Sequence, residues 1–421
     1  MRDGEIRALG EIAGRSVARP TTVAGDVHRA VTRRVFGALG PLGLPVRALH
    51  DPLSSISYKT VAAGLRAPLA AGARVLARGA SEGSASLAES RAGALALGAA
   101  NGFFGDRLAR DHPDLAVSLG FWHRGREVSL EPAAIAEAFG DATPRIAVFV
   151  HGLCETDDSW RAPYPGGRPR PTYGDRLRSD LEVTPVFVRY NTGLHISENG
   201  RALAEKLDDL VSAWPTEVEG IALIGHSMGG LVARSACHYA DLEGREYTRR
   251  IGHVICLGTP HLGAPLEKAA NVASWPLGRL PETRPFADLF LNGRSAGIKD
   301  LRFGSCLEDD WCDCDPDEFL RDRCRECPFL DSATYCFVAA TLSAGPRGAG
   351  GRVGDLLVTY SSASGEGRRR RIPFAEEHGS HVGGIDHLRL LNHPAVYERI
   401  HGWLAQDLLR RRPSPARDAR V

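Results

Sequence analysis

Residues 221–234 constrain the fold more than any other stretch, because they predict a strand, a sharp turn and a helix in direct succession. Residues 221–224 are all apolar, as in a strand that is buried on both faces. The sequence Gly225-His-Ser-Met-Gly229 then matches the pattern G-x-S-x-G, and apolar residues follow at helical spacing: Leu231, Val232, Ala236 and Tyr239. The two glycines leave room for the strained serine that such a turn requires. We therefore expect Ser227 to be a nucleophile at the edge of a sheet.

The size and composition fit one large α/β domain with additional segments. The chain has 421 residues, of which 43% are hydrophobic and 24% are charged, as in ordinary globular proteins. Its net charge of +1 gives no reason to expect a nucleic-acid partner. The N-terminus lacks the apolar core of a secretory signal, and no uncharged apolar run reaches membrane-spanning length. We therefore expect a cytoplasmic location.

Residues 1–112 predict a helical accessory region. Its first part carries an apolar stripe with three arginines nearby, formed by Val27, Val31, Val35, Ala38, Leu39, Arg29, Arg33 and Arg34. A basic amphipathic helix of this kind either packs against the catalytic domain or lies on a membrane surface. The sequence thus leaves peripheral membrane contact open.

Strands and helices alternate over residues 113–412, which predicts an α/β domain on a mostly parallel sheet with right-handed crossovers. Strands are expected near residues 115–120, 127–130, 146–150, 186–190, 221–224, 254–257 and 335–339. Helices are expected at residues 203–214 and from about residue 392. Residues 413–421 are expected to form a disordered tail.

A reactive serine needs donors for the oxyanion that forms when it attacks a carbonyl group. His151-Gly-Leu153 directly follows the third expected strand, and Gly152 permits a turn that aims backbone N–H groups inward. The N–H groups of Leu153 and Met228 are the expected oxyanion pair. We expect His151, Gly152 and His226, which flank these donors, to contact the substrate.

The acid that orients the base is expected after the next-to-last core strand. Asp355 follows the strand at residues 335–339 by about fifteen residues, a normal separation for an active-site loop. We therefore choose Asp355, although a surface turn would also explain an aspartate there. The alternative acids are Glu366, Glu376 and Glu377.

The base is expected to be a histidine on the loop before the last helix. Five histidines compete for this role: His378, His381, His387, His393 and His401. The last two lie at the start of the predicted helix or inside it, so neither projects freely toward Ser227. His387 is our choice, with His381 second. His387 would remove the Ser227 proton, and Asp355 would fix the imidazole tautomer.

Four motifs carry a resemblance to a known family. They are His151-Gly-Leu153, Gly225-His-Ser-Met-Gly-Gly230, Leu257-Gly-Thr-Pro-His-Leu-Gly-Ala264, and Asp386-His-Leu-Arg-Leu-Leu-Asn-His-Pro-Ala-Val-Tyr397 with Trp403-Leu404. Over residues 145–409 the chain resembles the lipase and esterase branch of the α/β-hydrolases, especially bacterial triacylglycerol lipases and PGAP1-like inositol deacylases. The resemblance implies an α/β-hydrolase fold, ester chemistry and a structural role for His261.

Two features depart from the pattern of that family. Leu356 stands where a second glycine often follows the acid. The N-terminal helical region has no counterpart in the secreted lipases. The resemblance therefore says nothing about what residues 1–112 do.

Residues 262–332 form an insert at the position where such enzymes carry a lid. A lid excludes water and shapes the acyl pocket. The thiols of the insert allow a zinc site, redox-sensitive disulfides or free thiols, and the candidate zinc ligands are Cys312, Cys314, Cys324 and Cys327. No metal and no cofactor is needed for the expected chemistry.

The sequence therefore predicts a serine hydrolase that cleaves carboxylic esters, with an acyl-ester or lipid-like small molecule as its substrate. An acyltransferase is one alternative, in which an alcohol replaces water at the same residues. A hydrolase fold that serves as an inactive binding scaffold is another. The sequence gives no indication of the oligomeric state.

Overall fold

The fold is centred on one eight-stranded sheet. The computed structural model describes residues 1–78, 86–161, 171–265, 267–268, 281, 293–315, 318, 320–346 and 348–410. The strands lie in the order β2-β1-β4-β3-β5-β6-β7-β8. β1 is antiparallel to β2 and β4, and all other neighbours are parallel. The strands are β1 (Gly120–His123), β2 (Arg126–Val128), β3 (Arg145–Val150), β4 (Thr184–Arg189), β5 (Gly220–His226), β6 (Ile251–Leu257), β7 (Thr334–Thr341) and β8 (Gly379–Gly383).

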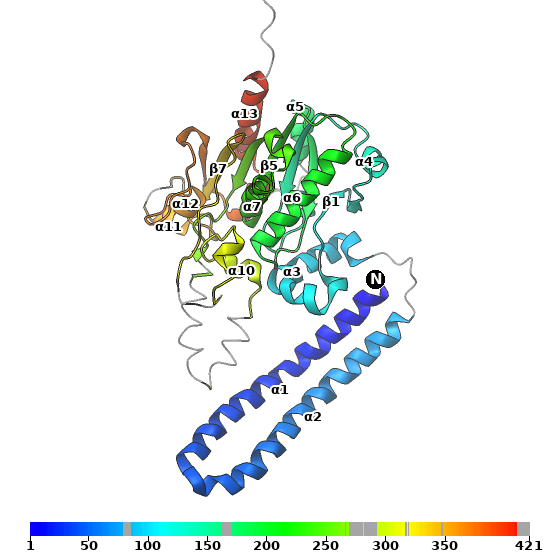
Figure 1. The fold of residues 1–421 in the computed structure, drawn as a ribbon, viewed down its shortest axis with the longest axis vertical. Helices are drawn as coiled ribbons and strands as arrows, with labels where there is room; N and C mark the ends of the chain where they lie inside the picture. The colour runs from blue at the N-terminus through cyan, green and yellow to red at the C-terminus, as the bar shows by residue number, and fades with distance from the viewer. Residues whose placement is uncertain are drawn as a thin grey trace, which may run out of the picture.

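Helices cover both faces of the sheet, so the strands from β3 to β7 are almost entirely buried (Figure 1). In β3, Ile146 and Val148 point into one hydrophobic cluster, whereas Ala147 and Phe149 point into the other. The first cluster is completed mainly by α6 and α7, and the second by α5 and α13. The helices in the described part of this domain are α4 (Pro132–Ala138), α5 (Tyr173–Leu181), α6 (Ile196–Ala213), α7 (Met228–Leu242), α10 (Ala296–Asp300), α11 (Ala349–Val353), α12 (Tyr360–Ala363) and α13 (Pro394–Arg410).

This architecture is the α/β-hydrolase fold that the sequence predicts. The expected core strands overlap with β3, β4, β5, β6 and β7, and the sheet between them is parallel. Ser227 follows β5, Asp355 follows β7 and His387 follows β8, so all three lie beyond the carboxyl ends of parallel strands.

The sheet differs from the sequence-based prediction in two respects. The strand expected at residues 115–120 begins only at Gly120, because Pro113–Leu115 form a 3-10 turn and Leu115 is buried in a cluster with Leu97 of α3. β8 was not predicted from the sequence, because its residues, Gly379-Ser-His-Val-Gly383, contain no apolar run. The tail expected at residues 413–421 lies outside the described residues.

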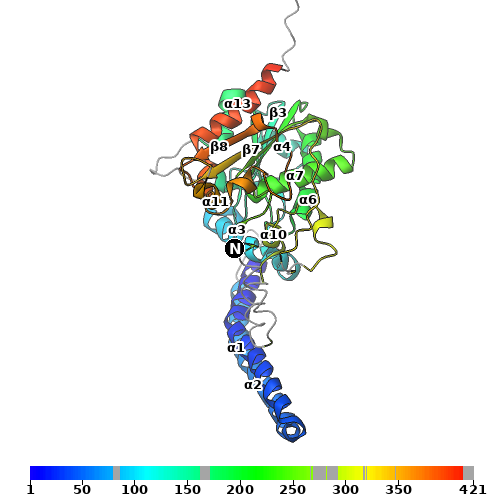
Figure 2. The same ribbon diagram turned by 90° about the vertical axis from the view of Figure 1, so that its left-hand side faces the viewer.

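The N-terminal region is helical, as expected, but its first two helices pack on each other. α1 (Asp3–Leu39) and α2 (Leu44–Ala77) form a hairpin that extends away from the sheet (Figures 1 and 2). The interpretation that the stripe of α1 packs against the catalytic domain is therefore wrong for most of that helix. α3 (Arg91–Asp111) lies between the hairpin and the sheet. Among the described helices, none combines the length and apolar character needed to cross a membrane.

Candidate active site

Ser227 occupies the sharp turn between β5 and α7. Its backbone has φ 53° and ψ −123°, a conformation that residues with a side chain rarely adopt. The flanking glycines are required by space, because a Cβ atom on Gly225 would lie 2.4 Å from the Gly230 nitrogen. A Cβ atom on Gly229 would lie 2.1 Å from the Val150 oxygen. The strained turn expected from the sequence is therefore present.

His387 and Asp355 are hydrogen-bonded to each other. His387 Nδ1 lies 2.7 Å from Asp355 Oδ2, and both side chains are buried. The other oxygen, Oδ1, accepts hydrogen bonds from the N–H groups of Leu357 and Val358 at 3.1 and 2.8 Å. The His387 N–H also donates to the Asp355 carbonyl at 3.1 Å. These contacts fix the carboxylate and leave His387 Nε2 on the side of the ring away from the acid.

Ser227 and His387 are held by neighbouring turns. The Ser227 N–H donates to the carbonyl of Leu257, the last residue of β6, at 2.8 Å. The next residue, Gly258, has φ 60°, and a Cβ atom there would lie 3.1 Å from His387 Cε1. Within the described part of the chain, the Ser227 hydroxyl forms no hydrogen bond. In free enzymes the serine–histidine contact is often loose and tightens when the substrate binds.

The two expected oxyanion donors flank Ser227. Met228 is the first residue of α7, so its N–H has no acceptor inside the helix. A Cβ atom on Gly152 would lie 2.9 Å from Ser227 Cβ, which places the loop after β3 against the serine. Leu153 follows in that loop, and no hydrogen bond among the described residues uses its N–H. Both N–H groups are therefore available to a developing oxyanion.

The pair Glu155 and His226 connects the oxyanion loop to the backbone of His387. Glu155 Oε2 accepts a hydrogen bond from the Gly152 N–H at 2.7 Å, and Glu155 Oε1 lies 2.9 Å from His226 Nδ1. His226 Nε2 lies 3.1 Å from the His387 carbonyl oxygen. Each nitrogen of the His226 ring thus faces an acceptor, which suits the doubly protonated form.

The charges of this pair stabilise each other, although His226 is fully buried and the Glu155 side chain is only 11% exposed. Burial opposes the charge of His226, but Glu155 outweighs it and raises the pKa of His226. Burial likewise opposes ionisation of Glu155, but His226 outweighs it and lowers the pKa of Glu155. Glu155 was not predicted from the sequence. The one feature that could have indicated it is the presence of an acid three residues after the His151-Gly152 pair.

The side chains of His151 and His226 lie beneath the loops that carry Gly152 and Ser227. Both are fully buried. His151 Nδ1 lies 2.9 Å from the Gly152 carbonyl, and its Nε2 accepts from the Tyr190 N–H at 3.3 Å. Burial lowers the pKa of His151 to about 4, so this ring is neutral at physiological pH. Both imidazoles therefore contact the loops around Ser227, and substrate contact by these residues stays a prediction.

The alternative base and one alternative acid are engaged elsewhere. His381 lies on β8, where its Nε2 is 2.8 Å from Thr341 Oγ1 of β7. Glu366 forms an ion pair with Arg371 at 4.0 Å. His387 is thus the histidine that the fold brings to Asp355.

The structure gives physical reasons for two features that the family resemblance raised, at Leu356 and His261. Leu356 has φ 87°, in the region that favours glycine, which gives a physical reason for a glycine at this position in relatives. His261 is buried, and its Nδ1 lies 3.1 Å from Arg234 Nη1 of α7. This contact agrees with a structural role for His261.

The described part of the insert packs beside the loops that surround Ser227. Asp300 at the end of α10 accepts a hydrogen bond from the Ile196 N–H, at the start of α6, at 2.9 Å. Ser295 Oγ donates to the Gly102 carbonyl of α3 at 2.6 Å. Seven large apolar residues of the insert, which a lid would use to shape an acyl pocket, lie outside the described residues: Trp275, Leu277, Leu280, Phe286, Leu289, Phe290 and Leu291.

The four thiols considered as zinc ligands do not gather in space. Cys312 is exposed, whereas Cys327 is buried beside Arg234, which donates to the Cys327 carbonyl at 3.2 Å. Cys324 Sγ lies 3.3 Å from Ser305 Oγ. In the described residues, which include all four thiols, no three His, Cys, Asp or Glu side chains are arranged to hold a metal ion. The zinc interpretation therefore gains no support from the structure.

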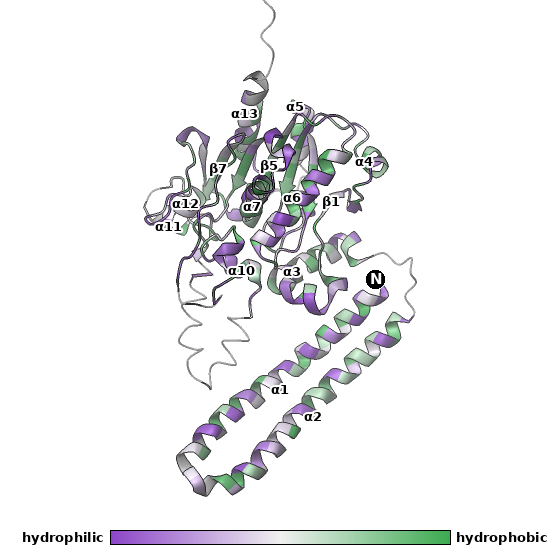
Figure 3. Ribbon diagram, in the orientation of Figure 1, coloured by the Kyte–Doolittle hydropathy of each residue, from purple (hydrophilic) through white to green (hydrophobic). Residues whose placement is uncertain are grey.

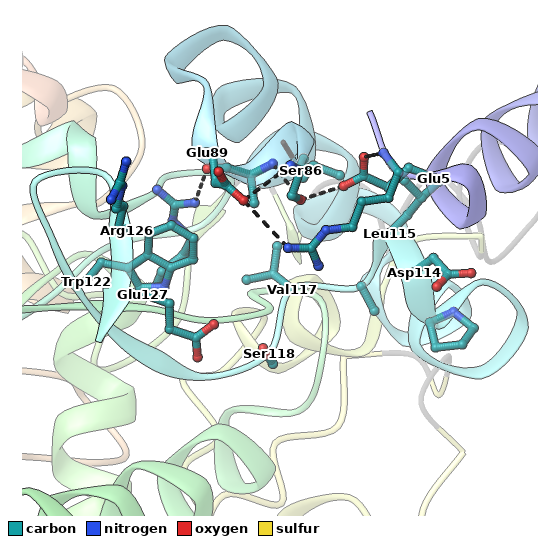
Figure 4. Close-up of a pocket in the computed structure, with 16 residues that line it drawn as sticks. Glu5, Ser86, Glu89, Asp114, Leu115, Val117, Ser118, Trp122, Arg126 and Glu127 are labelled. Atoms are coloured by element: carbon teal, nitrogen blue, oxygen red, sulfur yellow. Dashed lines mark hydrogen bonds and ion pairs between the residues drawn. The ribbon is translucent and has the colours of Figure 1, made fainter. Parts of the chain in front are cut away.

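A polar cavity of about 650 Å³ lies where the N-terminal helices meet β1 and β2 (Figure 4). Glu5 accepts hydrogen bonds there from Ser86 Oγ at 2.5 Å and from the Leu87 N–H at 2.9 Å. Arg189 of β4 donates to the Ala88 carbonyl at 2.7 Å. Ser227, Asp355 and His387 do not line this cavity, which marks the attachment of the N-terminal region to the sheet.

The strand order and the strained serine turn define an α/β-hydrolase. Within this class, residues 189–275 match the model of the PGAP1-like alpha/beta domain family. The resemblance to PGAP1-like proteins expected from the motifs is thus confirmed over the segment that contains Ser227. No curated protein matches the chain.

The chain is also similar to solved structures of a lipase, a carboxyl esterase and a thioesterase. The mature form of the Bacillus licheniformis lipase BlEst2 is 21% identical, over 64% of this chain and 92% of that chain, with a TM-score of 0.38. The metagenomic carboxyl esterase MGS0156 is 17% identical, over 63% of this chain and 76% of that chain, with a TM-score of 0.37. The RedJ thioesterase of Streptomyces coelicolor is 19% identical, over 63% of this chain and 91% of that chain, with a TM-score of 0.34.

Proposed function

We propose that this chain is a serine hydrolase that cleaves carboxylic esters through an acyl-enzyme on Ser227. The observation that carries the proposal is the buried His387–Asp355 hydrogen bond beside a strained serine. Residues 113–412 are the catalytic domain, and the substrate is an acyl-ester or lipid-like small molecule. Residues 262–332 are its lid, as supported by the packing of α10 beside α3 and α6.

In the first half of the reaction, His387 Nε2 removes the Ser227 proton while Oγ attacks the ester carbonyl. Asp355 accepts the hydrogen bond from His387 Nδ1–H, which fixes the tautomer and stabilises the imidazolium. The oxyanion of the tetrahedral intermediate accepts hydrogen bonds from the N–H groups of Leu153 and Met228. His387 then gives its proton to the leaving alcohol, and the acyl group remains on Ser227.

In the second half, water attacks the acyl-enzyme while His387 takes its proton. Collapse of the second tetrahedral intermediate releases the carboxylic acid and returns the proton to Ser227. An alcohol in place of water would give a new ester, so the same residues would then act as an acyltransferase.

Labelling by a fluorophosphonate tests the proposal directly, because only an activated serine displaces its leaving group. We expect one label, on the peptide that contains Ser227, together with hydrolysis of simple acyl esters. Product analysis with a competing alcohol distinguishes hydrolysis from acyl transfer. A folded protein that takes no label and cleaves no ester would instead be a binding scaffold.

Glu155 supplies a test of the supporting network. Glu155→Ala should lower kcat roughly ten- to hundredfold with a smaller change in KM, because small displacements of reacting groups have effects of this size. Glu155→Gln should recover most of the loss, since its amide offers an oxygen to the Gly152 N–H and an N–H to His226.

The matched control for Glu155 is Glu217→Ala, since the Glu217 side chain is 86% exposed. It should change neither kcat nor KM. If Glu155→Ala folds normally and keeps the wild-type kcat, the pair of Glu155 and His226 does not position the site.

A further inference from the structure

After the first turns of α1, the α1–α2 hairpin concentrates positive charge. Residues 12–77 contain nine Lys and Arg residues and two Asp and Glu residues, a net charge of +7, whereas the whole chain has +1 and the remaining residues −6. The two acids, Asp26 and Asp51, already form ion pairs with Arg29 and Arg47 of their own helices. The hairpin is therefore a cationic arm on an otherwise acidic protein.

The hairpin also exposes aliphatic side chains. Hydrophobic residues recur along both of its helices (Figure 3). Its helices contact each other through small residues, because a Cβ atom on Gly10 would lie 2.0 Å from Ala73 Cβ. A Cβ atom on Gly14 would lie 2.9 Å from the Arg66 carbonyl oxygen. Such close approach leaves large side chains outside the contact. Seven of them on α2 are between 52% and 70% exposed: Leu44, Val46, Leu53, Ile56, Val61, Val75 and Leu76.

The hairpin stands on the side of the molecule where the candidate active site lies. A Cβ atom on Gly102 of α3 would lie 2.2 Å from Cys154 Sγ, so α3 packs directly on the loop after β3 that flanks Ser227. Glu5 of α1 is hydrogen-bonded to Ser86, just before α3. From there the hairpin extends beyond α3, away from the sheet (Figures 1 and 2).

We propose that the α1–α2 hairpin binds the surface of anionic lipid bilayers and holds the catalytic domain there. The exposed aliphatic side chains would enter the boundary between headgroups and acyl chains, while the Lys and Arg side chains contact acidic headgroups. A second copy of the hairpin would bring the same positive charge, and a nucleic acid would offer no apolar layer for the aliphatic side chains. An anionic lipid surface offers both negative charge for the cations and an apolar layer for the aliphatic side chains.

Co-sedimentation of the full-length protein with vesicles tests this inference. We expect binding to vesicles of phosphatidylcholine with phosphatidylserine, at least tenfold weaker binding to phosphatidylcholine alone, and a further decrease at high salt. The pair Arg33→Gln/Arg34→Gln should weaken binding by more than tenfold, since each cation near the surface is worth roughly fivefold. The pair Leu53→Asn/Ile56→Asn should weaken binding by about tenfold or more, because it removes apolar area that the bilayer would bury.

The matched control is Leu242→Asn/Arg249→Gln, which changes an exposed leucine, 71% exposed, and an exposed arginine on the catalytic domain. It should bind vesicles like the wild type. Ser227→Ala should also bind like the wild type, so a failure of the proposed ester chemistry would leave this result unchanged. Circular dichroism melting checks that every variant is folded.

Three outcomes would overturn the inference. The first is equal binding, or none, to vesicles with and without phosphatidylserine. The second is an equal loss in the control pair, which would place the contact outside the hairpin. The third is a hairpin variant that binds vesicles normally but loses self-association or binding to duplex DNA. The binding partner of the hairpin would then be a second copy of the chain or a nucleic acid.

Discussion

Ser227→Ala is expected to lower kcat for ester hydrolysis by several orders of magnitude, on the order of 10⁴- to 10⁶-fold. The covalent route then has no nucleophile, and only substrate binding and the oxyanion donors still act on bound substrate. Alanine also carries a Cβ atom, so the strained backbone with φ 53° persists in the variant. The protein should therefore keep its melting temperature, and initial rates with a short acyl ester measure the loss.

Ser380→Ala is the matched control for this loss, because Ser380 lies on β8 and takes no part in the proposed chemistry. It should keep both turnover and fluorophosphonate labelling. If the purified Ser227→Ala protein retains turnover and is still labelled, another residue is the nucleophile and the proposed mechanism fails.

The parts of the site that lie within one stretch of sequence were predictable. β5, Ser227 and α7 are contiguous, and the glycines of the turn are required by local space, so the motif identifies the turn by itself. The assignments of Asp355 and His387 came from their order along the chain and from the family resemblance. The hydrogen bond between them is a feature that only the folded chain displays.

Glu155 shows why other parts were not predictable. Its partner His226 is 71 residues away in sequence, and its effect depends on burial that the fold creates. A single glutamate in a loop is usually a solvated surface residue. In the same way, Gly10 and Gly14 allow close helix contact but do not specify which helix will pack there, so α2 could not be identified as the partner of α1.

Polar edge strands present a related difficulty. β8 forms because its backbone pairs with β7, from Phe337 with Gly379 to Thr341 with Gly383. Its side chains contribute little apolar area, and hydrophobic periodicity is the main signal for a strand. As a result His381 was assigned to a loop and was considered as the second candidate for the base. In the fold it lies on β8 instead.

His387→Ala should lower kcat almost as far as Ser227→Ala, because the members of a triad act as a unit. The double variant Ser227→Ala/His387→Ala should then be no slower than either single variant. His381→Ala is the matched control and should be far milder, since His381 Nε2 is bonded to Thr341 Oγ1 at 2.8 Å and Asp355 is bonded to His387. Steady-state kinetics with one acyl ester compare all four proteins. If His381→Ala shows the large loss and His387→Ala the small one, His381 is the base, and the His387–Asp355 hydrogen bond serves the fold of the loop instead of the reaction.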